Sequence, residues 1–97
     1  MTDPTAMRAP PDPTEGDAEL VARLGRGDER ALRDLHRRYA SLVFTVAART
    51  VDAAGAEEVV QDVFMTLWRK PETFDPTRGA LKTWLCQVTR RRALNLL

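Results

Sequence analysis

The sequence has few of the residues on which most metal sites and disulfides depend. It contains one cysteine, Cys86, and one histidine, His36, among its 97 residues. These exclude a disulfide within the chain and are too few for a Cys/His zinc site. No apolar run approaches the roughly 20 residues that cross a bilayer, and no signal-like stretch opens the chain. We therefore expect a cytoplasmic protein that is not inserted in a membrane.

Charge of one sign is missing from two stretches of the chain. Residues 52–62 hold four acidic residues and no basic one. No acidic residue follows Asp75, whereas five basic residues do: Arg78, Lys82, Arg90, Arg91 and Arg92. The net charge is only +1, so the distribution carries the information. It indicates one acidic and one basic surface, which can hold two different partners.

Proline is scarce beyond the first residues. Residues 1–16 hold four of the six prolines and no periodic apolar pattern, which is typical of a disordered tail. Residues 17–97 are enough for one small domain. Their apolar spacing predicts helices and no strands.

The first two expected helices both begin at an aspartate. A short helix has Asp17 as its N-cap, carries Leu20, Val21 and Leu24, and ends near residues 25–27. A long helix then has Asp28 as its N-cap, and its apolar stripe consists of Leu32, Leu35, Tyr39, Leu42, Val43, Val46 and Ala47. Off that stripe we expect exposed side chains, namely Arg30, Arg33, His36, Arg37 and Arg38.

A third helix is expected from Asp52, its N-cap, to about Arg69, with Pro71 ending it. One half of its surface is apolar and is expected to face the core, with Val59, Val60, Val63, Phe64, Leu67 and Trp68. The other half carries a narrow strip for solvent or a partner, made of Glu58, Gln61, Asp62, Met65 and Arg69.

A loop of turn-forming residues, 71–79, is expected to be anchored by Phe74 and to lead into a fourth helix. That helix starts near Gly79 and continues to the end of the chain. Its inward residues are Leu81, Trp84, Leu85, Val88 and Leu96, and its outward residues are Thr83, Gln87, Arg90 and Leu94, with Arg91 on the flank. Arg92 is expected to cap or pair within the domain. The prediction is an all-α domain, a small bundle of three long helices and one short N-terminal helix.

The motifs that would support catalysis are missing. The sequence shows no nucleophile with a base partner, no paired carboxylates, no Gly-rich phosphate loop and no metal-ligand cluster. We expect no enzyme, no cofactor and no metal site. The outward Arg, Gln and Asn side chains of the fourth helix suit phosphate and base-edge contacts. Trp84 can stack on an unpaired base or pack within the domain, and its spacing alone favours packing.

Three segments, taken together and in order, resemble a known family. They are "GDERALRDLHRRY" at the start of the long helix, "AEEVVQDVFMTLWR" in the third, and "FDPTRGALKTWL" leading into the fourth. With this spacing the chain resembles region 2 of bacterial sigma-70 factors over residues 17–97. It looks most like the extracytoplasmic-function (ECF) group of RNA polymerase sigma factors.

The resemblance implies two partners. In the family the third helix binds the clamp helices of the RNA polymerase β′ subunit. The loop and the fourth helix recognise and help open the promoter −10 element, holding bases flipped from the non-template strand. By position, the implied polymerase-binding residues are Glu58, Gln61, Asp62 and Met65. The implied DNA-binding residues are Phe74, Asp75, Thr77, Arg78, Gly79, Lys82, Thr83, Trp84, Gln87, Arg90, Arg91 and Asn95.

Two positions depart from the family pattern. Primary sigma factors have adjacent aromatic residues where this chain has Thr83 and Trp84, which implies greater dependence on a matching promoter, as in other ECF members. Many ECF members have asparagine where this chain has Arg91, so the base preference there stays open. Gln87 and Arg90 match residues that read the upstream edge of the element.

ECF sigma factors also have a second helical domain, region 4, which reads the −35 element. It is absent from this sequence. The resemblance therefore leads us to expect part of a longer factor or a shortened gene product, with Leu94, Leu96 and Leu97 partly uncovered.

A function of another class remains open, a helical protein-interaction module bound by a regulator without direct DNA readout. The family provides such a regulator, because anti-sigma factors sequester ECF domains by covering these surfaces. An anti-sigma factor is therefore an expected partner. Only DNA binding should weaken steeply with salt and depend on Arg90 and Arg91.

Overall fold

The computed structural model describes residues 16–97, which contain four α-helices and two short 3-10 helices. The short α2 spans Asp17–Gly25, and the three long helices are α3 (Glu29–Ala47), α4 (Ala53–Arg69) and α5 (Leu81–Asn95). No strand occurs in this range. The predicted all-α fold is confirmed. The predicted tail, residues 1–16, lies outside the described residues except for Gly16.

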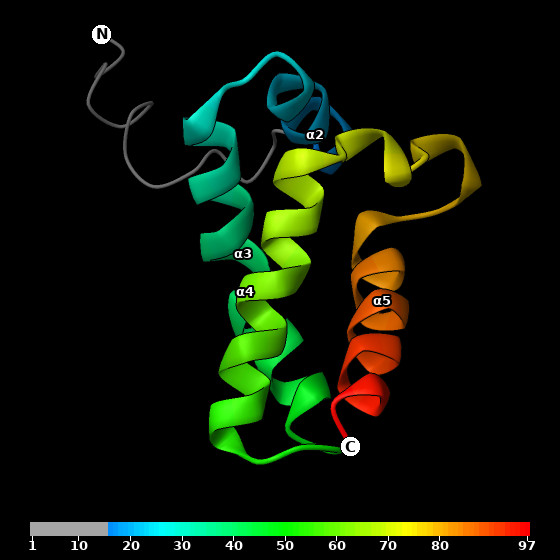
Figure 1. Cartoon of the computed structure of the whole chain (residues 1–97). Helices are drawn as coiled ribbons and strands as arrows, with labels where there is room; N and C mark the ends of the chain where they lie inside the picture. Colours follow the sequence, from blue (N-terminus) through cyan, green and yellow to red (C-terminus); the bar gives the residue numbers. More distant parts are fainter. Residues whose placement is uncertain (1–15) are drawn as a thin grey trace, which may run out of the picture.

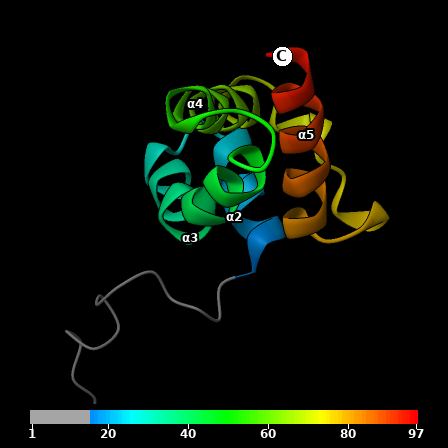
Figure 2. The same cartoon turned by 90° about the horizontal axis from the view of Figure 1, so that it is seen from below.

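The three long helices stand side by side, and the short helix closes one end of the bundle (Figure 1). Seen from below, α3, α4 and α5 form the corners of a triangle (Figure 2). Each long helix contacts the other two, and α2 contacts α3 and the η1 turn of the loop that joins α4 to α5. The loop and α2 therefore lie at one end of the bundle. The C-terminus lies at the opposite end, near the α3–α4 turn.

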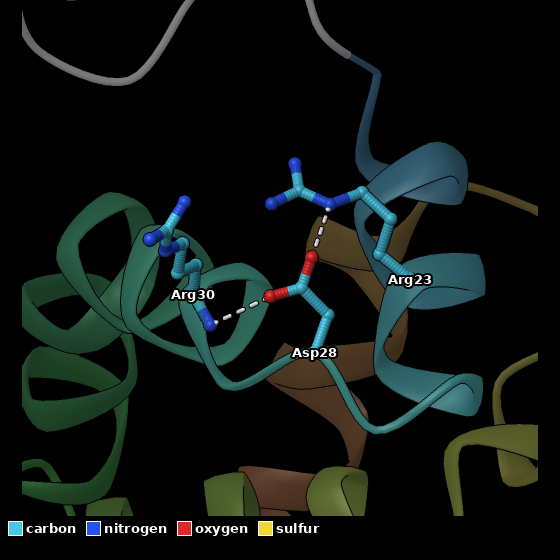
Figure 3. A network of polar contacts seen from close by, with 3 residues as sticks. All are labelled: Arg23, Asp28 and Arg30. Atoms are coloured by element: carbon cyan, nitrogen blue, oxygen red, sulfur yellow. Dashed lines mark hydrogen bonds and ion pairs between the residues drawn. The ribbon is translucent and has the colours of Figure 1, made fainter.

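The turn between α2 and α3 is closed by backbone and side-chain hydrogen bonds. Gly27 has a φ of 81°, and its N–H donates to the Leu24 carbonyl at 2.8 Å, while the Asp28 N–H donates to the Arg23 carbonyl at 3.1 Å. This pattern is a Schellman motif, and its positive φ favours glycine. The Asp28 carboxylate accepts from the Arg30 N–H and from the Arg23 Nε–H, each at 2.9 Å (Figure 3). The predicted N-cap is confirmed, and one carboxylate joins two helices.

These contacts also set the ionisation of Asp28. The hydrogen bond from the Arg23 side chain, followed by that from the Arg30 backbone, holds the pKa of the Asp28 carboxyl below its usual value.

Asp17 does not have its predicted role as an N-cap. The cap of α2 is Gly16, without a side-chain hydrogen bond, and Asp17 is the first helical residue. Its carboxylate instead accepts from an Arg38 guanidinium N–H at 2.9 Å and from the Tyr39 hydroxyl, both on α3. Charge-assisted bonds of this kind are stronger than a neutral hydrogen bond, so the carboxylate turns toward α3. Arg38 is therefore a half-buried ion-pair partner, and the prediction that it is solvent-exposed was wrong.

α4 has the predicted boundaries. Oδ1 of Asp52 accepts from the Gly55 N–H at 2.8 Å, which confirms the N-cap. The helix ends at Arg69, and Pro71 begins the η1 turn (Pro71–Thr73). Pro71 lacks an N–H for another helical turn, which explains the stop.

The core lies between the three long helices and extends under α2 and the loop. Most predicted core residues are buried or half-buried, among them Leu20, Leu35, Val59, Leu67 and Leu85. Small residues that the apolar pattern did not single out are also fully buried, namely Ala31, Ala56, Thr89 and Ala93. They allow the helix backbones to approach closely. Leu96 was placed on the inward stripe but is 43% exposed, because α5 ends at Asn95 and the helical spacing no longer applies. The expectation that Leu94, Leu96 and Leu97 are partly uncovered is confirmed.

Candidate nucleic-acid and protein interfaces

The loop before α5 is held by its own hydrogen bonds. It consists of η1 and a second 3-10 turn, η2 (Pro76–Arg78). Oδ1 of Asp75 accepts from the Thr77 N–H at 2.9 Å and from the Thr77 hydroxyl at 2.7 Å. The side-chain bond, and then the backbone bond, hold the pKa of the Asp75 carboxyl below its usual value. Gly79 follows with a φ of 146°, a conformation that other residues rarely adopt.

Phe74 anchors this loop, as predicted. Its side chain is only 5% exposed and belongs to the same core cluster as Leu20, Val21 and Leu24 of α2. The Phe74 and Trp84 rings lie 5.9 Å apart between centroids, with their planes at 58°. This is the tilted arrangement that aromatic pairs prefer. The pair fixes the loop against the first turn of α5.

This aromatic pair is part of the lining of a groove of about 360 Å³, which we call the loop–α5 groove. It is lined by Thr73, Phe74, Asp75, Arg78, Gly79, Ala80, Thr83, Trp84 and Gln87. The structure thus brings seven of the predicted DNA-binding residues to one hollow. Thr73 and Ala80 were missed, since neither side chain carries a distinctive signal. Trp84 is half-buried, so it both packs on Phe74 and borders the groove.

The remaining predicted DNA-binding residues lie outside the groove lining. Thr77 is occupied with the Asp75 carboxylate, and Lys82, Arg90, Arg91 and Asn95 are exposed on α5. No acidic residue of the chain follows Asp75, so the charges of α5 are all positive, with Lys82 in its first turn and Arg90, Arg91 and Arg92 toward its end. Such a helix attracts phosphate groups whatever the base sequence.

The three consecutive arginines of α5 divide between two roles. Arg90 and Arg91 are exposed, whereas Arg92 is half-buried and its Nη2 donates to the Thr66 hydroxyl of α4 at 2.8 Å. The prediction that Arg92 pairs within the domain is confirmed. Thr89 is fully buried on the same side, and its hydroxyl donates to the Leu85 carbonyl at 2.6 Å.

The strip on α4 is exposed as predicted. The side chains of Glu58, Gln61 and Asp62 make no hydrogen bond or ion pair within residues 16–97, and Met65 is 38% exposed. A single exposed methionine is ordinary on a protein surface, so Met65 by itself does not indicate a protein contact.

A second, larger groove was missed by the sequence analysis. It has a volume of about 860 Å³ and runs between α3 and α4. Its apolar residues are Leu32, Ala40, Phe44, Val60, Phe64 and Met65, and its polar residues are Arg33, His36, Arg37, Ser41, Glu57 and Gln61. The exposed His36 lies over Phe64, with ring centroids 4.9 Å apart. The available signal was a pair of apolar residues of α3 outside its predicted stripe, Ala40 and Phe44, which line the groove beside Leu32.

Two further expectations concern other kinds of site. Among residues 16–97, no group of three or more His, Cys, Asp or Glu side chains is arranged to hold a metal ion. Within the same range, no helix combines the length and apolar character that crossing a bilayer requires.

The fold and the loop–α5 groove define a small all-α domain, and comparison with known proteins assigns it to a family. A solved NMR structure, that of an engineered region 2 of sigmaE in complex with GTAAAA, aligns with a TM-score of 0.76 and 29% sequence identity. The alignment covers 89% of this chain and 90% of that one. The family model described as Sigma-70 region 2 matches residues 35–97. The chain belongs to the sigma-70 region 2 family.

Curated relatives place the chain within one group of that family. RpoE of Cereibacter sphaeroides, an ECF RNA polymerase sigma factor, is 35% identical over 86 residues, covering 87% of this chain and 47% of the relative. SigK of Mycobacterium ulcerans, of the same group, is 28% identical over 90 residues, covering 92% of this chain and 48% of the relative. The chain is an ECF-type region 2 domain and spans about half the length of these relatives.

Proposed function

We propose that this chain is the promoter-recognition domain of an ECF sigma factor, a non-enzymatic specificity subunit of cytoplasmic RNA polymerase. In this proposal the loop–α5 groove holds bases of the non-template strand of the −10 element. The observation that carries it is the accessibility of the groove. Gln87 and Arg90 are exposed, and Trp84 borders an open hollow with Phe74 beneath it.

The energies of this task agree with so small a domain. Unpairing and unstacking a base costs a few kcal/mol, and stacking on an aromatic side chain returns about 1–3 kcal/mol per base. Arg90 and Arg91 add phosphate attraction that carries no sequence information. The isolated domain should therefore bind DNA weakly. Tethering to polymerase raises the local concentration of the groove at the promoter without new base contacts.

The test of DNA recognition uses single strands and the whole chain. We expect binding of a non-template −10 strand, measured by NMR titration, to exceed binding of a scrambled strand of equal composition. Affinity should fall steeply with salt and be lost in the Arg90→Ala, Arg91→Ala double variant. Arg30→Ala, Arg33→Ala is the matched control, since it removes two exposed arginines of α3. Equal binding of both strands would remove the claim of readout.

The α4 strip is the proposed contact with the clamp helices of β′. Its Glu58, Gln61, Asp62 and Met65 side chains are exposed and do not hold the fold together. We expect Asp62→Lys to weaken binding of a β′ clamp-helix fragment at least tenfold, as expected for a reversed charge in an interface. Glu19→Lys, an exposed reversal on α2, is the control. Unchanged affinity of Asp62→Lys would count against this assignment.

The α3–α4 groove favours a second candidate role, binding of a protein regulator such as an anti-sigma factor. Its floor is apolar, with Arg33 and Arg37 along one helix and Glu57 on the other. These features suit an amphipathic helix. If regulator binding were the only function, the Arg90→Ala, Arg91→Ala variant would bind the regulator with unchanged affinity. The unaltered chain would then bind no single-stranded DNA.

A further inference from the structure

Asp75 is the one acidic side chain that lines the loop–α5 groove, and it is the last acidic residue of the chain. A carboxylate beside a DNA-binding surface repels phosphate groups, so its presence needs a reason. One reason is local, because Oδ1 caps η2 through the Thr77 N–H. A neutral serine or asparagine caps a helix equally well. Capping therefore does not account for the charge.

The second carboxylate oxygen is available to a ligand. Both hydrogen bonds of the Asp75 carboxylate within residues 16–97 go to Oδ1, at 2.9 Å from the Thr77 N–H and 2.7 Å from the Thr77 hydroxyl. Two bonds to one oxygen fix the orientation of the carboxylate. They also favour its ionised form, which only accepts hydrogen bonds. Asp75 is part of the groove lining, together with Phe74 and Trp84, and its Oδ2 carries no hydrogen bond within residues 16–97. Oδ2 is thus a charged acceptor that remains open to a ligand.

We propose that Asp75 determines base preference in this groove by accepting a hydrogen bond from the exocyclic amino group of a captured base. The amino groups concerned are N4 of cytosine and N6 of adenine, whereas thymine presents the O4 acceptor at the corresponding position and guanine the O6 acceptor, its own amino group N2 lying elsewhere on the ring. An acceptor facing the carboxylate is repelled. The groove therefore selects cytosine and adenine against thymine. This inference rests on the proposed function, since it specifies the base that the same groove holds.

The experiment compares the hexanucleotides dC6 and dT6. Each contains a single kind of base, so the groove meets the same base in every register of binding. Both contain pyrimidines, and the extra C5-methyl group of thymine adds stacking area that works against the expected preference. Affinities are measured by following the Trp84 indole N–H in an NMR titration at constant salt. We expect the unaltered chain to bind dC6 about fivefold more tightly than dT6, the effect of one charge-assisted hydrogen bond in a solvent-accessible groove. The strand dA6 should follow dC6.

Asp75→Asn is the informative variant. Its side-chain carbonyl retains the cap on Thr77, while its amide group replaces the second acceptor by a donor. We expect the preference for dC6 to disappear or to reverse toward dT6, whose O4 accepts from that amide. The control is Asp52→Asn, which makes the same chemical and charge change at the N-cap of α4. It should leave the dC6-to-dT6 ratio unchanged.

The possible results separate the readout from the function on which it rests. Equal affinity of the unaltered chain for dC6 and dT6 overturns the readout alone. Discrimination that persists in Asp75→Asn overturns it as well, because the charge then has no part in base selection. Absence of salt-dependent binding to any strand, including a −10 strand, overturns the proposed function and the readout together.

Discussion

The loop–α5 groove and the α4 strip differ in how far they depend on the fold. The groove is built from residues that also stabilise the domain, since Phe74 lies in the core and Asp75 closes the loop. The strip consists of side chains such as Glu58 and Asp62, which make no hydrogen bond or ion pair within residues 16–97. Substitutions should therefore change binding alone on the strip but binding and stability together at the groove.

The largest effect is expected at the floor of the groove. Phe74→Ala removes a buried ring, and we expect the free energy of unfolding to fall by about 3 kcal/mol. Thermal and denaturant unfolding measure this loss, and DNA binding should weaken with it. Phe74→Leu is the control, because it retains most of the buried volume. A loss below about 1 kcal/mol for Phe74→Ala would show that the ring does not anchor the loop.

A smaller loss of stability is expected at α2, the helix that contacts both α3 and the η1 turn of the loop. Asp17→Ala removes the acceptor for Arg38 and Tyr39 and should lower the free energy of unfolding by about 2 kcal/mol. Hydrogen exchange should accelerate most in α2 and in residues 71–79. Glu19→Ala, an exposed acidic residue on the same helix, should change neither quantity. Uniform acceleration across α4 and α5 would contradict a local role.

The contact of Tyr39 with Asp17 also predicts that the stability of the domain decreases at alkaline pH. Burial, and then the hydrogen bond to Asp17, raise the pKa of Tyr39 to about 12. The unfolded chain releases this proton near pH 10, so the stabilisation is complete below pH 10 and is lost as the pH rises toward 12.

We expect the loss over this window to be about 1 kcal/mol, a value reduced for solvent screening of a half-buried side chain. Denaturant unfolding at pH 9 and pH 11.5 measures it. Tyr39→Phe should show a smaller decrease between the two values. An equal decrease would assign the alkaline effect to other groups.

The smallest effect on stability is expected on the strip. Glu58→Lys should change the free energy of unfolding by no more than about 0.5 kcal/mol, since an exposed side chain without a partner contributes little. Its affinity for a clamp-helix fragment should nevertheless fall. Thermal unfolding and fragment binding, measured on the same sample, check both parts. A stability loss comparable to that of Asp17→Ala would remove the contrast between the two regions.

The helices were predictable because their signals are local. Asp28 and Asp52 cap helices as expected, and Pro71 ends α4 as expected. Helical spacing also separated the exposed Arg90 from the inward Leu85. These features depend on neighbouring residues in the chain, which the sequence displays directly.

The remaining features depend on contacts between distant residues. Asp17 has an N-cap signal, but its partners Arg38 and Tyr39 lie on the next helix and outcompete the local bond. Ala31 and Ala93 are buried because helices approach each other there, which apolar periodicity does not reveal. The α3–α4 groove is formed by side chains of two helices, so neither helix alone predicts it.

For the candidate sites, the sequence indicated which face of each helix is exposed. Resemblance to the family, not spacing, supplied the roles of those faces. The base preference proposed for the groove depends on which oxygen of Asp75 is already occupied by Thr77, a contact that the sequence does not reveal.

The hydrogen bond from Arg92 to Thr66 connects the helix that carries the strip with the helix that borders the groove. Around it, the buried Leu67 of α4 and the buried Leu85 and Thr89 of α5 leave little freedom for one helix to slide along the other. If the strip contacts polymerase and the groove holds a base, as proposed, the distance between the two sites is set by the packing of α4 against α5. The folded domain then fixes how far from its polymerase contact a base can be held.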